Sequence, residues 1–439
     1  MRITWRDLGA VRAEKAHGRT VELSGYALTL LPTDKADYFL LMAEPGCCAG
    51  CVPANKLAVV EIFMRAPVKL GDKLQLTGTW HVSTDGEEWR YQLRGATAKT
   101  GVSRRALLAA SPLFCLPVPS MAQAATNGVD LHSHAGKILY VNSNAAFDPV
   151  AAPMRQGGMA AICLAMVADS PTTQITDGRI RAFRNPNPGE LYAWSTRAFE
   201  RLHRLVREQG LGIVRSAAEM RAATSAQPSV VVSAEGADFL EGRIERLDEA
   251  YDRWALRHLQ LTHYRPNELG DIQTEPPEKD GLTAFGADVI RRCNQRGIVV
   301  DVAHGTFDLV KKAAAISTKP LVLSHTSLTE RPSAWTRLIT PDHARAIAAT
   351  GGVIGIWPAK FVFGTIQAWV QGIARMANVV GVDHVGIGTD QLGLPGGSAL
   401  PDYNDVPQLA AALAGRFNPD EVAKLMGGNY RRVFEASVG

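Results

Sequence analysis

A set of imidazole and carboxylate side chains follows short apolar runs in the second part of this sequence. The residues are His132, His134, Glu235, His304, His325 and Asp390. Each run has the length of a buried strand, for example IVVDVAH at 298–304 and PLVLSH at 320–325. In a barrel of parallel strands the carboxyl ends open on one mouth, where active sites of this architecture lie. Because zinc takes imidazole nitrogens and carboxylate oxygens as ligands, the pattern predicts a metal-dependent hydrolase.

The spacing also predicts how the ions are held. His132 and His134 are two apart on an extended segment, so they point to the same side and can grip one cation. Glu235 supplies two oxygens that can bridge two cations, while His304 and His325 are neutral imidazole donors. Water between two ions about 3.5–4 Å apart is ionised near neutral pH and can attack an electrophilic carbon. We therefore expect two divalent metal ions, zinc foremost, with a bridging hydroxide as nucleophile.

Strand-like and helix-like runs alternate from Val129 onward. The strand candidates are 129–133, 160–167, 229–233, 258–262, 298–303, 320–324, 352–356 and 384–389. The amphipathic stretches between them are 190–209, 244–257, 284–295, 307–317, 341–350 and 365–380. Ser216 with Glu219, and Thr340 before Pro341, are helix start signals. The alternation predicts an α/β fold, a (β/α)8 TIM barrel carrying the binuclear metal site, with further helices of 406–434 on its outside.

Length and composition fit a globular chain of two domains. At 439 residues the sequence is long for one core. A composition of 46% hydrophobic and 21% charged residues is that of a folded protein. The formal net charge is only +4 and the Lys and Arg residues are scattered, so nucleic-acid binding gets no support. The six Cys are too few and too unevenly placed for a disulfide framework.

Residues 1–100 are predicted to form a small all-β domain. Alternating apolar stretches occur at 20–30, 38–43, 57–64, 73–82 and 89–94, separated by turn signals. Five such strands suggest a barrel of the OB-like type. This part is similar to small bacterial domains of uncharacterised function, a similarity that implies no activity. Cys48 and Cys51 have the spacing of a redox or metal pair, but without a second pair a four-thiolate zinc site cannot close, which favours buried or idle thiols.

Residues 101–126 have the form of a bacterial export signal. Arg104 and Arg105 precede a short apolar region, and a small-x-small cleavage pattern ends at 122–124. The apolar region is too short and too rich in Pro for a stable membrane span. Because the segment is internal, an interdomain linker is the alternative. We expect a periplasmic barrel over residues 127–439, with a cytoplasmic location as the alternative.

Residues from about 127 to 436 resemble the membrane (renal-type) dipeptidase family of the amidohydrolase superfamily. The resemblance is carried by motifs spread along this range: VDLHSHAG (129–136), SAEGADFLEG (233–242), LQLTHYRPNELGD (259–271), 281–308, PLVLSHTS (320–327), GGVIGI (351–356), HVGIGTD (384–390) and GGNYRRVF (427–434). Members hydrolyse dipeptides with two bridged zinc ions. The resemblance therefore implies a metallodipeptidase, a hydrolase that acts in proteolysis on a small-molecule dipeptide substrate.

The resemblance also implies residue roles. His132 and His134 would hold the first ion, Glu235 would bridge, and His304 with His325 would hold the second. His263 would contact the scissile carbonyl, Arg337 would bind the substrate carboxylate, and Asp390 would act as proton shuttle. The planar guanidinium of Arg337 can form two parallel hydrogen bonds with a free carboxylate and would thereby recognise the C-terminal end of the substrate. The alternatives are structural: a surface charge for Arg337 and strand-end hydrogen bonds for His263 and Asp390.

The sequence departs from the family pattern at three places. His134 stands where the family usually has Asp, so the first ion site has one negative charge less. Leu392 replaces a second acidic residue that many members have, and the loop around Trp357 lacks the usual aromatic and Asn pattern. Two other functions therefore stay open: hydrolysis of N-acyl amino acids or lactones by the same centre, and a catalytically silent metal-binding barrel fused to an interaction module. A homodimer is an open expectation for the assembly.

Overall fold

The computed structural model describes residues 1, 3–8, 11–28, 35–43, 59–69, 73–83, 90–98, 127–141, 146–176, 178–329, 336–394 and 396–439. The signal-like segment 101–126 lies outside these residues, as do Cys47, Cys48, Cys51 and Cys115. The chain divides into two compact units, residues 1–122 with 360–365 and residues 123–359 with 366–439. No helix among the described residues is long and apolar enough to cross a membrane.

The N-terminal unit is a closed five-stranded barrel. Its strands are β1 (Thr20–Leu28), β2 (Lys35–Met42), β3 (Val59–Lys69), β4 (Leu74–Val82) and β5 (Tyr91–Ala98). They pair in the order β1-β2-β3-β5-β4, and the antiparallel β1–β4 pair closes the barrel. Buried and less buried residues alternate along β4, as expected for a strand with one face on a core. The structure confirms the small all-β domain predicted from the sequence.

Short helical turns close the end of this small barrel. The elements are η1 (Trp5–Asp7) and α1 (Val11–Glu14). Trp80 is fully buried, stacks on Tyr91 with ring centroids 5.4 Å apart, and donates its indole N–H to the Ala13 carbonyl at 2.9 Å. A buried Trp needs such a partner for its N–H, so this contact ties α1 to the barrel core.

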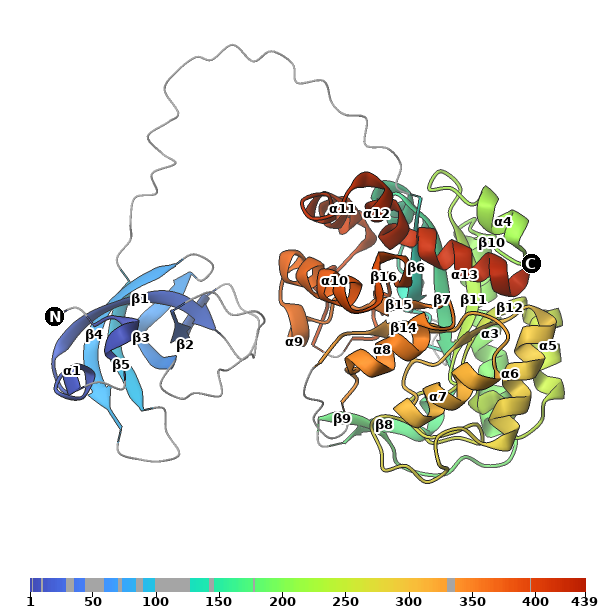
Figure 1. Cartoon of the computed structure of the whole chain (residues 1–439), viewed down its shortest axis with the longest axis horizontal. Coiled ribbons are helices and arrows are strands. Elements are labelled where there is room, and N and C mark those ends of the chain that lie inside the picture. The colour runs from blue at the N-terminus through green and yellow to red at the C-terminus, as the bar shows by residue number, and fades with distance from the viewer. Residues whose placement is uncertain are drawn as a thin grey trace, which may run out of the picture. The chain divides into compact units, whose positions relative to one another are not determined.

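The second unit contains an eight-stranded parallel barrel, shown in green to orange in Figure 1. Its strands are β6 (Gly128–Ser133), β7 (Met159–Val167), β11 (Ser229–Glu235), β12 (Leu256–Gln260), β13 (Val299–Asp301), β14 (Val322–Thr326), β15 (Val353–Ile356) and β16 (Val385–Ile387). Pairing of β7 with β11, and of β16 with β6, closes the ring. The predicted (β/α)8 barrel is confirmed. The sequence did not predict the hairpin β8 (Thr173–Thr176) and β9 (Arg179–Ala182), or the short strand β10 (Gly212–Ile213).

Helices surround the strands of this unit (Figure 1). They are α2 (Ala151–Gly157), α3 (Glu190–Glu208), α4 (Ala217–Ala222), α5 (Glu245–Trp254), α6 (Ala284–Arg296), α7 (Phe307–Ile316), α8 (Pro341–Ala348), α10 (Ile366–Val380), α11 (Val406–Ala414), α12 (Pro419–Ala423) and α13 (Asn429–Val438). The short helix α9 (Lys360–Phe363) belongs to the segment 360–365, which groups with the first unit. The predicted start signals are present: the side chains of Ser216 and Thr340 accept hydrogen bonds from the backbone N–H of Glu219 and His343.

The last helix, α13, covers the amino ends of the barrel strands. Its Tyr430, Val433 and Phe434 are fully buried in one cluster with the first apolar residues of several strands, such as Val129 and Val322. The sequence predicted this tail on the outside of the barrel, whereas α13 closes one end of it. The carboxyl ends of the strands, at the opposite end, carry the polar residues described next.

Candidate metal centre

The strand-end residues singled out in the sequence converge at the carboxyl ends of the strands. Their elements are β6 for His132, β11 for Glu235, which is its last residue, and β14 for His325. The three others follow strand ends: His134 after β6, His304 after β13 and Asp390 after β16. All six are at least nine-tenths buried. The barrel thus brings together side chains that are up to 258 positions apart in the sequence, as His132 and Asp390 are.

The Glu235 carboxylate lies at the centre of the group. Its Oε1 is 3.4 Å from His132 Nε2, 3.2 Å from His304 Nε2 and 3.5 Å from His325 Nε2. Its Oε2 is 3.2 Å from His134 Nε2, and His134 Nε2 is also 3.4 Å from Asp390 Oδ1. One carboxylate therefore faces four imidazole nitrogens, two on each side of it in the barrel order.

These separations suit a metal ion. Two ligands at the tetrahedral angle on one zinc ion lie about 3.3–3.4 Å apart, given zinc–nitrogen distances of about 2.0–2.1 Å. His132 and His134 are 3.2 Å apart at their Nε2 atoms, and His304 and His325 are 3.0 Å apart. Two neutral imidazoles that aim lone pairs at each other cannot form a hydrogen bond, so each pair needs a cation or a proton between its nitrogens. The donor set and its geometry fit bound metal.

Backbone and side-chain contacts fix the ring orientations of two of the ligands. His134 donates its Nδ1–H to the Ala165 carbonyl at 2.8 Å, so that Nε2, the nitrogen that would bind metal, faces Glu235. Ser324 Oγ lies 2.9 Å from His325 Nδ1. Such outer contacts set the tautomer of a metal-binding imidazole and aim its other nitrogen. The Nδ1 atoms of His132 and His304 are buried and have no hydrogen-bond partner among the described residues.

Two buried carboxylates beneath the ligands join the strand ends. Asp130 accepts hydrogen bonds from the Thr389 backbone N–H at 2.8 Å and from the Tyr403 hydroxyl at 2.7 Å. Asp301 accepts from the Ser324 N–H at 3.1 Å. Each carboxylate thereby links its own strand to the segment that carries a site residue, Asp390 in one case and His325 in the other. Neither role was inferred from the sequence, because the bonds depend on which strands become neighbours.

The backbone is strained at two of the site residues. His304 and Asp390 have positive φ angles of 66° and 49°, a region that costs non-glycine residues energy and that clusters at functional sites. Leu392 follows with φ 64°. A Cβ on Gly393 would lie 2.0 Å from Asp390 Oδ1 and 2.6 Å from His134 Cδ2. The absence of a side chain at position 393 therefore makes room for both site residues.

Burial and the close contacts between ionisable side chains determine which groups at the centre are charged. Burial opposes ionisation of Glu235, but the surrounding His263 and His132 outweigh it and hold the pKa of the carboxyl well below its usual value. Burial lowers the pKa of His304 and of His325 well below the usual value, with Arg337 and the neighbouring imidazoles adding to the effect. Both rings are therefore neutral at pH 7, which is the form that binds metal.

His263, in the LTH motif, lies beside the centre and not within a strand. Its Nε2 is 3.4 Å from Glu235 Oε2, and its Nδ1 is 2.7 Å from Asp169 Oδ1. Burial would lower the pKa of His263, but the carboxylates of Asp169 and Glu235 outweigh burial and raise it. Asp169 was missed in the sequence, although the rule used for the other residues applies to it: it comes two positions after the predicted strand 160–167.

Arg337 is buried next to the centre and is not a surface charge. It is 9% exposed, donates from Nη1 to Gln273 Oε1 at 2.8 Å, and lies over the Trp357 ring with 5.6 Å to the centroid. Its Nε has no hydrogen-bond partner among the described residues. Tyr264 also interacts with the guanidinium, and burial raises the pKa of its hydroxyl to about 12. A buried guanidinium with an unused donor fits the recognition of an anionic group.

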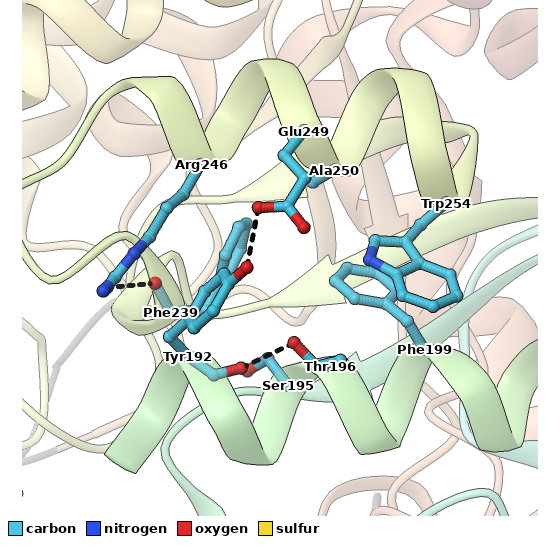
Figure 2. A pocket seen from close by; sticks show the side chains of 9 residues that line it. All are labelled: Tyr192, Ser195, Thr196, Phe199, Phe239, Arg246, Glu249, Ala250 and Trp254. Atoms are coloured by element: carbon cyan, nitrogen blue, oxygen red, sulfur yellow. Dashed lines mark hydrogen bonds between the residues drawn. The ribbon is translucent and has the colours of Figure 1, made fainter. Parts of the chain in front are cut away.

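A second concavity, between α3 and α5, shares no residue with the metal centre. Figure 2 shows its lining of aromatic and polar side chains: Tyr192, Ser195, Thr196, Phe199, Phe239, Arg246, Glu249, Ala250 and Trp254. The Tyr192 hydroxyl donates to Glu249 across it at 2.7 Å. The space for a water-sized molecule is about 10 Å³, enough for one water at most. This concavity is a packing seam between two helices and takes no substrate.

Comparison with known proteins gives a consistent picture. The family model described as "Membrane dipeptidase (Peptidase family M19)" matches residues 139–438, a range that begins after His132 and His134. Dipeptidase tcpJ of Claviceps purpurea is 29% identical over 227 residues, which cover 49% of this chain and 52% of the relative. The chain thus spans about half the length of the curated relatives it matches.

Two solved structures share the barrel fold. An amidohydrolase from Pseudomonas aeruginosa superposes with a TM-score of 0.56 at 21% identity, covering 72% of this chain and 98% of its own. A metallo peptidase from Rhodobacter sphaeroides, liganded with a phosphinate mimic of the dipeptide L-Ala-D-Ala, superposes with a TM-score of 0.60 at 20% identity, covering 71% of this chain and 99% of its own. At this level of identity the likeness establishes the fold.

Metal binding to this centre should strengthen as pH rises. Burial opposes protonation of His134, but hydrogen bonds to Asp390 and Glu235 outweigh it and raise its pKa from 6.5 to about 10. Below that pH an ion must displace a proton from His134, so the apparent Kd for Zn²⁺ should rise by up to about tenfold for each pH unit lost. Competition titration against a chromophoric chelator between about pH 6 and 8 measures this slope. His134→Asp, which removes that proton, should flatten it; equal slopes in both proteins would contradict the assignment.

Proposed function

Because the chain belongs to the membrane dipeptidase family, peptidase family M19, we propose that it is a metallodipeptidase that hydrolyses the peptide bond of dipeptides. One observation carries the proposal: four buried imidazoles converge on Glu235, with Asp390 beside His134, and next to them lies a buried guanidinium with an unused donor. The imidazoles and carboxylates form a metal site, and the guanidinium recognises an anionic end of a small substrate. A catalytically silent barrel would have no use for the guanidinium.

The proposed centre holds two divalent ions, with zinc as the expected metal. His132, His134 and Glu235 would hold the first ion, and Glu235, His304 and His325 the second. Bound ions would supply a Lewis acid for the scissile carbonyl and would lower the pKa of a bound water. Glu235 is suited to the shared position because both of its oxygens face imidazoles, Oε1 on the His304 side and Oε2 on the His134 side.

Asp390 is the proposed proton shuttle. Its carboxylate faces the centre from the end of β16, where its backbone N–H donates to the His132 carbonyl at 2.9 Å. In this position it accepts a proton from the attacking water at a carboxylate oxygen and returns that proton to the nitrogen of the leaving amine. The C–N bond then breaks, the protonated nitrogen leaves as a neutral amine, and the Asp390 carboxylate is regenerated.

His263 and Arg337 are the proposed substrate contacts. His263 Nε2 faces the carbonyl of the scissile bond, where a hydrogen-bond donor to the developing oxyanion contributes about 2.7–4 kcal/mol. Arg337 binds the free carboxylate of the substrate with its planar fork. Arg337 is buried close to His325, whose carbonyl its Nη2 faces at 3.5 Å, so a carboxylate bound to Arg337 would lie close to the proposed metal ligands and leave little room for further residues after the scissile bond. This arrangement selects dipeptides.

Compartment and assembly are further proposals. We propose export by the twin-arginine route, supported by Arg104-Arg105 and the apolar region that follows. A mature start near Ala125 in a periplasmic fraction, found by N-terminal sequencing, is the expected result. Full-length chain in the cytoplasm alone would mean that residues 101–126 are a linker.

A homodimer is the proposed assembly, which analytical ultracentrifugation of the purified protein would test.

The purified protein should contain about two divalent ions per chain and lose activity with a chelator. Zinc should restore hydrolysis of dipeptides, because the ligand set is neutral imidazole and carboxylate. Metal analysis combined with a panel of dipeptides, N-acyl amino acids and lactones makes the measurement. Full activity of the metal-free protein would contradict the metal site. If only N-acyl amino acids or lactones are hydrolysed, the substrate class is one of these and not dipeptides.

Arg337→Lys should weaken turnover of dipeptides specifically. The substitution keeps the charge but loses the planar fork, so kcat/KM for a dipeptide should fall while the low kcat/KM for its amide, which has no carboxylate, should hardly change. Asp390→Asn is the matched comparison and should depress both substrates, because it removes the proton shuttle. Equal losses on the dipeptide and its amide in Arg337→Lys would show that this residue holds the loop and not the substrate carboxylate.

A further inference from the structure

Asp169 connects the end of β7 to the residues beside the metal centre. It is fully buried, although burying a carboxylate is costly unless the charge is paired. Its Oδ1 lies 2.7 Å from His263 Nδ1, and its Oδ2 accepts a hydrogen bond from the backbone N–H of Tyr264 at 3.0 Å. The two oxygens of one carboxylate therefore hold two consecutive residues that face the site.

The carboxylate itself is held in place by the turn that carries it. The carbonyl of Asp169 accepts hydrogen bonds from the Thr172 N–H at 2.9 Å, the Thr172 hydroxyl at 3.0 Å and the Thr173 hydroxyl at 3.3 Å. Ala168, one residue earlier, donates its N–H to the Glu235 carbonyl at 3.0 Å. The position of Asp169 is thus tied to the backbone of the central carboxylate of the site.

A carboxylate accepts hydrogen bonds and cannot donate them, so the imidazole nitrogen against it must carry a proton. We propose that Asp169 is the positioning residue of His263: it keeps a proton on Nδ1 and turns Nε2 toward Glu235 and the substrate. The proposal rests on the proposed function, because it assigns His263 Nε2 to the scissile carbonyl. Without Asp169 the ring is free to rotate or to carry its proton on the wrong nitrogen.

The same carboxylate also positions Tyr264. The Tyr264 ring lies 4.8 Å from the ring of His304, nearly perpendicular to it, and its hydroxyl interacts with Arg337. Asp169 therefore positions two residues. One is His263, which is proposed to face the scissile carbonyl, and the other is Tyr264, which lies between His304 and Arg337. Its neighbour Asp238 has a different role, because its oxygens accept hydrogen bonds from Arg265 at 2.9 Å and Asn267 at 3.1 Å, whereas the hydrogen bond to His263 Nδ1 comes from Asp169.

Steady-state kinetics of the zinc-loaded full chain test the proposal. Asp169→Asn should lower kcat for a dipeptide about 10- to 100-fold, the range found for outer residues that orient a catalytic imidazole. KM and metal content should change little, since the interaction with His263 acts in the transition state. In the His263→Ala background the same substitution should cause a much smaller loss, which is the part due to Tyr264. Asp238→Asn is the matched control, and its effect should be the same in both backgrounds.

A second readout does not need activity. In metal-free protein with ¹⁵N-labelled histidine, the His263 Nδ1–H should give an NMR signal protected from solvent exchange, identified by its loss in His263→Ala. This signal should disappear in Asp169→Asn and persist in Asp238→Asn. A general loss of structure would instead disturb the signals of the other histidines, such as His258, which is buried between Tyr430 and Asp301.

The outcomes separate the two proposals. If the wild-type protein hydrolyses dipeptides and Asp169→Asn keeps its kcat, or lowers kcat as much in the His263→Ala background as in the wild type, the positioning role is overturned while the proposed function stands. If no dipeptide is turned over, the proposed function fails, and the NMR measurement alone decides the positioning: a protected Nδ1–H that persists in Asp169→Asn overturns it, and its loss supports it.

Discussion

The structure depends on the crowding of basic nitrogens around one buried carboxylate. Five imidazole Nε2 atoms, that of His263 included, lie 3.2–3.5 Å from the oxygens of Glu235, and two pairs of them are within 3.2 Å of each other. Neutral rings cannot bond to each other in this arrangement, and charged rings would repel. A metal ion or a proton between the nitrogens makes it favourable. The free energy of metal binding would therefore contribute to holding the five strand ends together.

The remainder of the barrel keeps these nitrogens from moving apart. Asp130 and Asp301 each bind backbone N–H groups of a neighbouring strand end, so the ligand segments are joined by buried hydrogen bonds that cannot be exchanged for water. The positive φ angles of His304 and Asp390 store strain that such contacts compensate. At the other end, α13 fills the barrel with Tyr430 and Phe434. The packing of α13 against the amino ends of the strands thus helps to keep the side chains at the carboxyl ends in place.

Much of the fold and several of the site residues could be predicted from the sequence, because both follow from strand position. An apolar run that ends in His, Glu or Asp predicts a buried strand with a polar side chain at the barrel mouth, and His132, Glu235 and His325 lie there. Gln273, Tyr264 and the carboxylate network of Asp130 could not be predicted in this way. Their contacts depend on loop conformations and on strand neighbours, which no local pattern encodes. Asp169 obeys the strand-end rule but lacked a motif to draw attention to it.

The replacement of the usual Asp by His134 changes the charge of the proposed centre. With two divalent ions bound, Glu235 and Asp390 offset only part of the positive charge, and buried Arg337 adds to it. Excess positive charge in a site of low dielectric favours ionised water and an anionic substrate end, but it also disfavours a protonated His263. The Asp169 carboxylate, 2.7 Å behind the ring of His263, counteracts that effect. A neutral ligand at position 134 and a buried acid at position 169 are therefore complementary parts of one electrostatic arrangement.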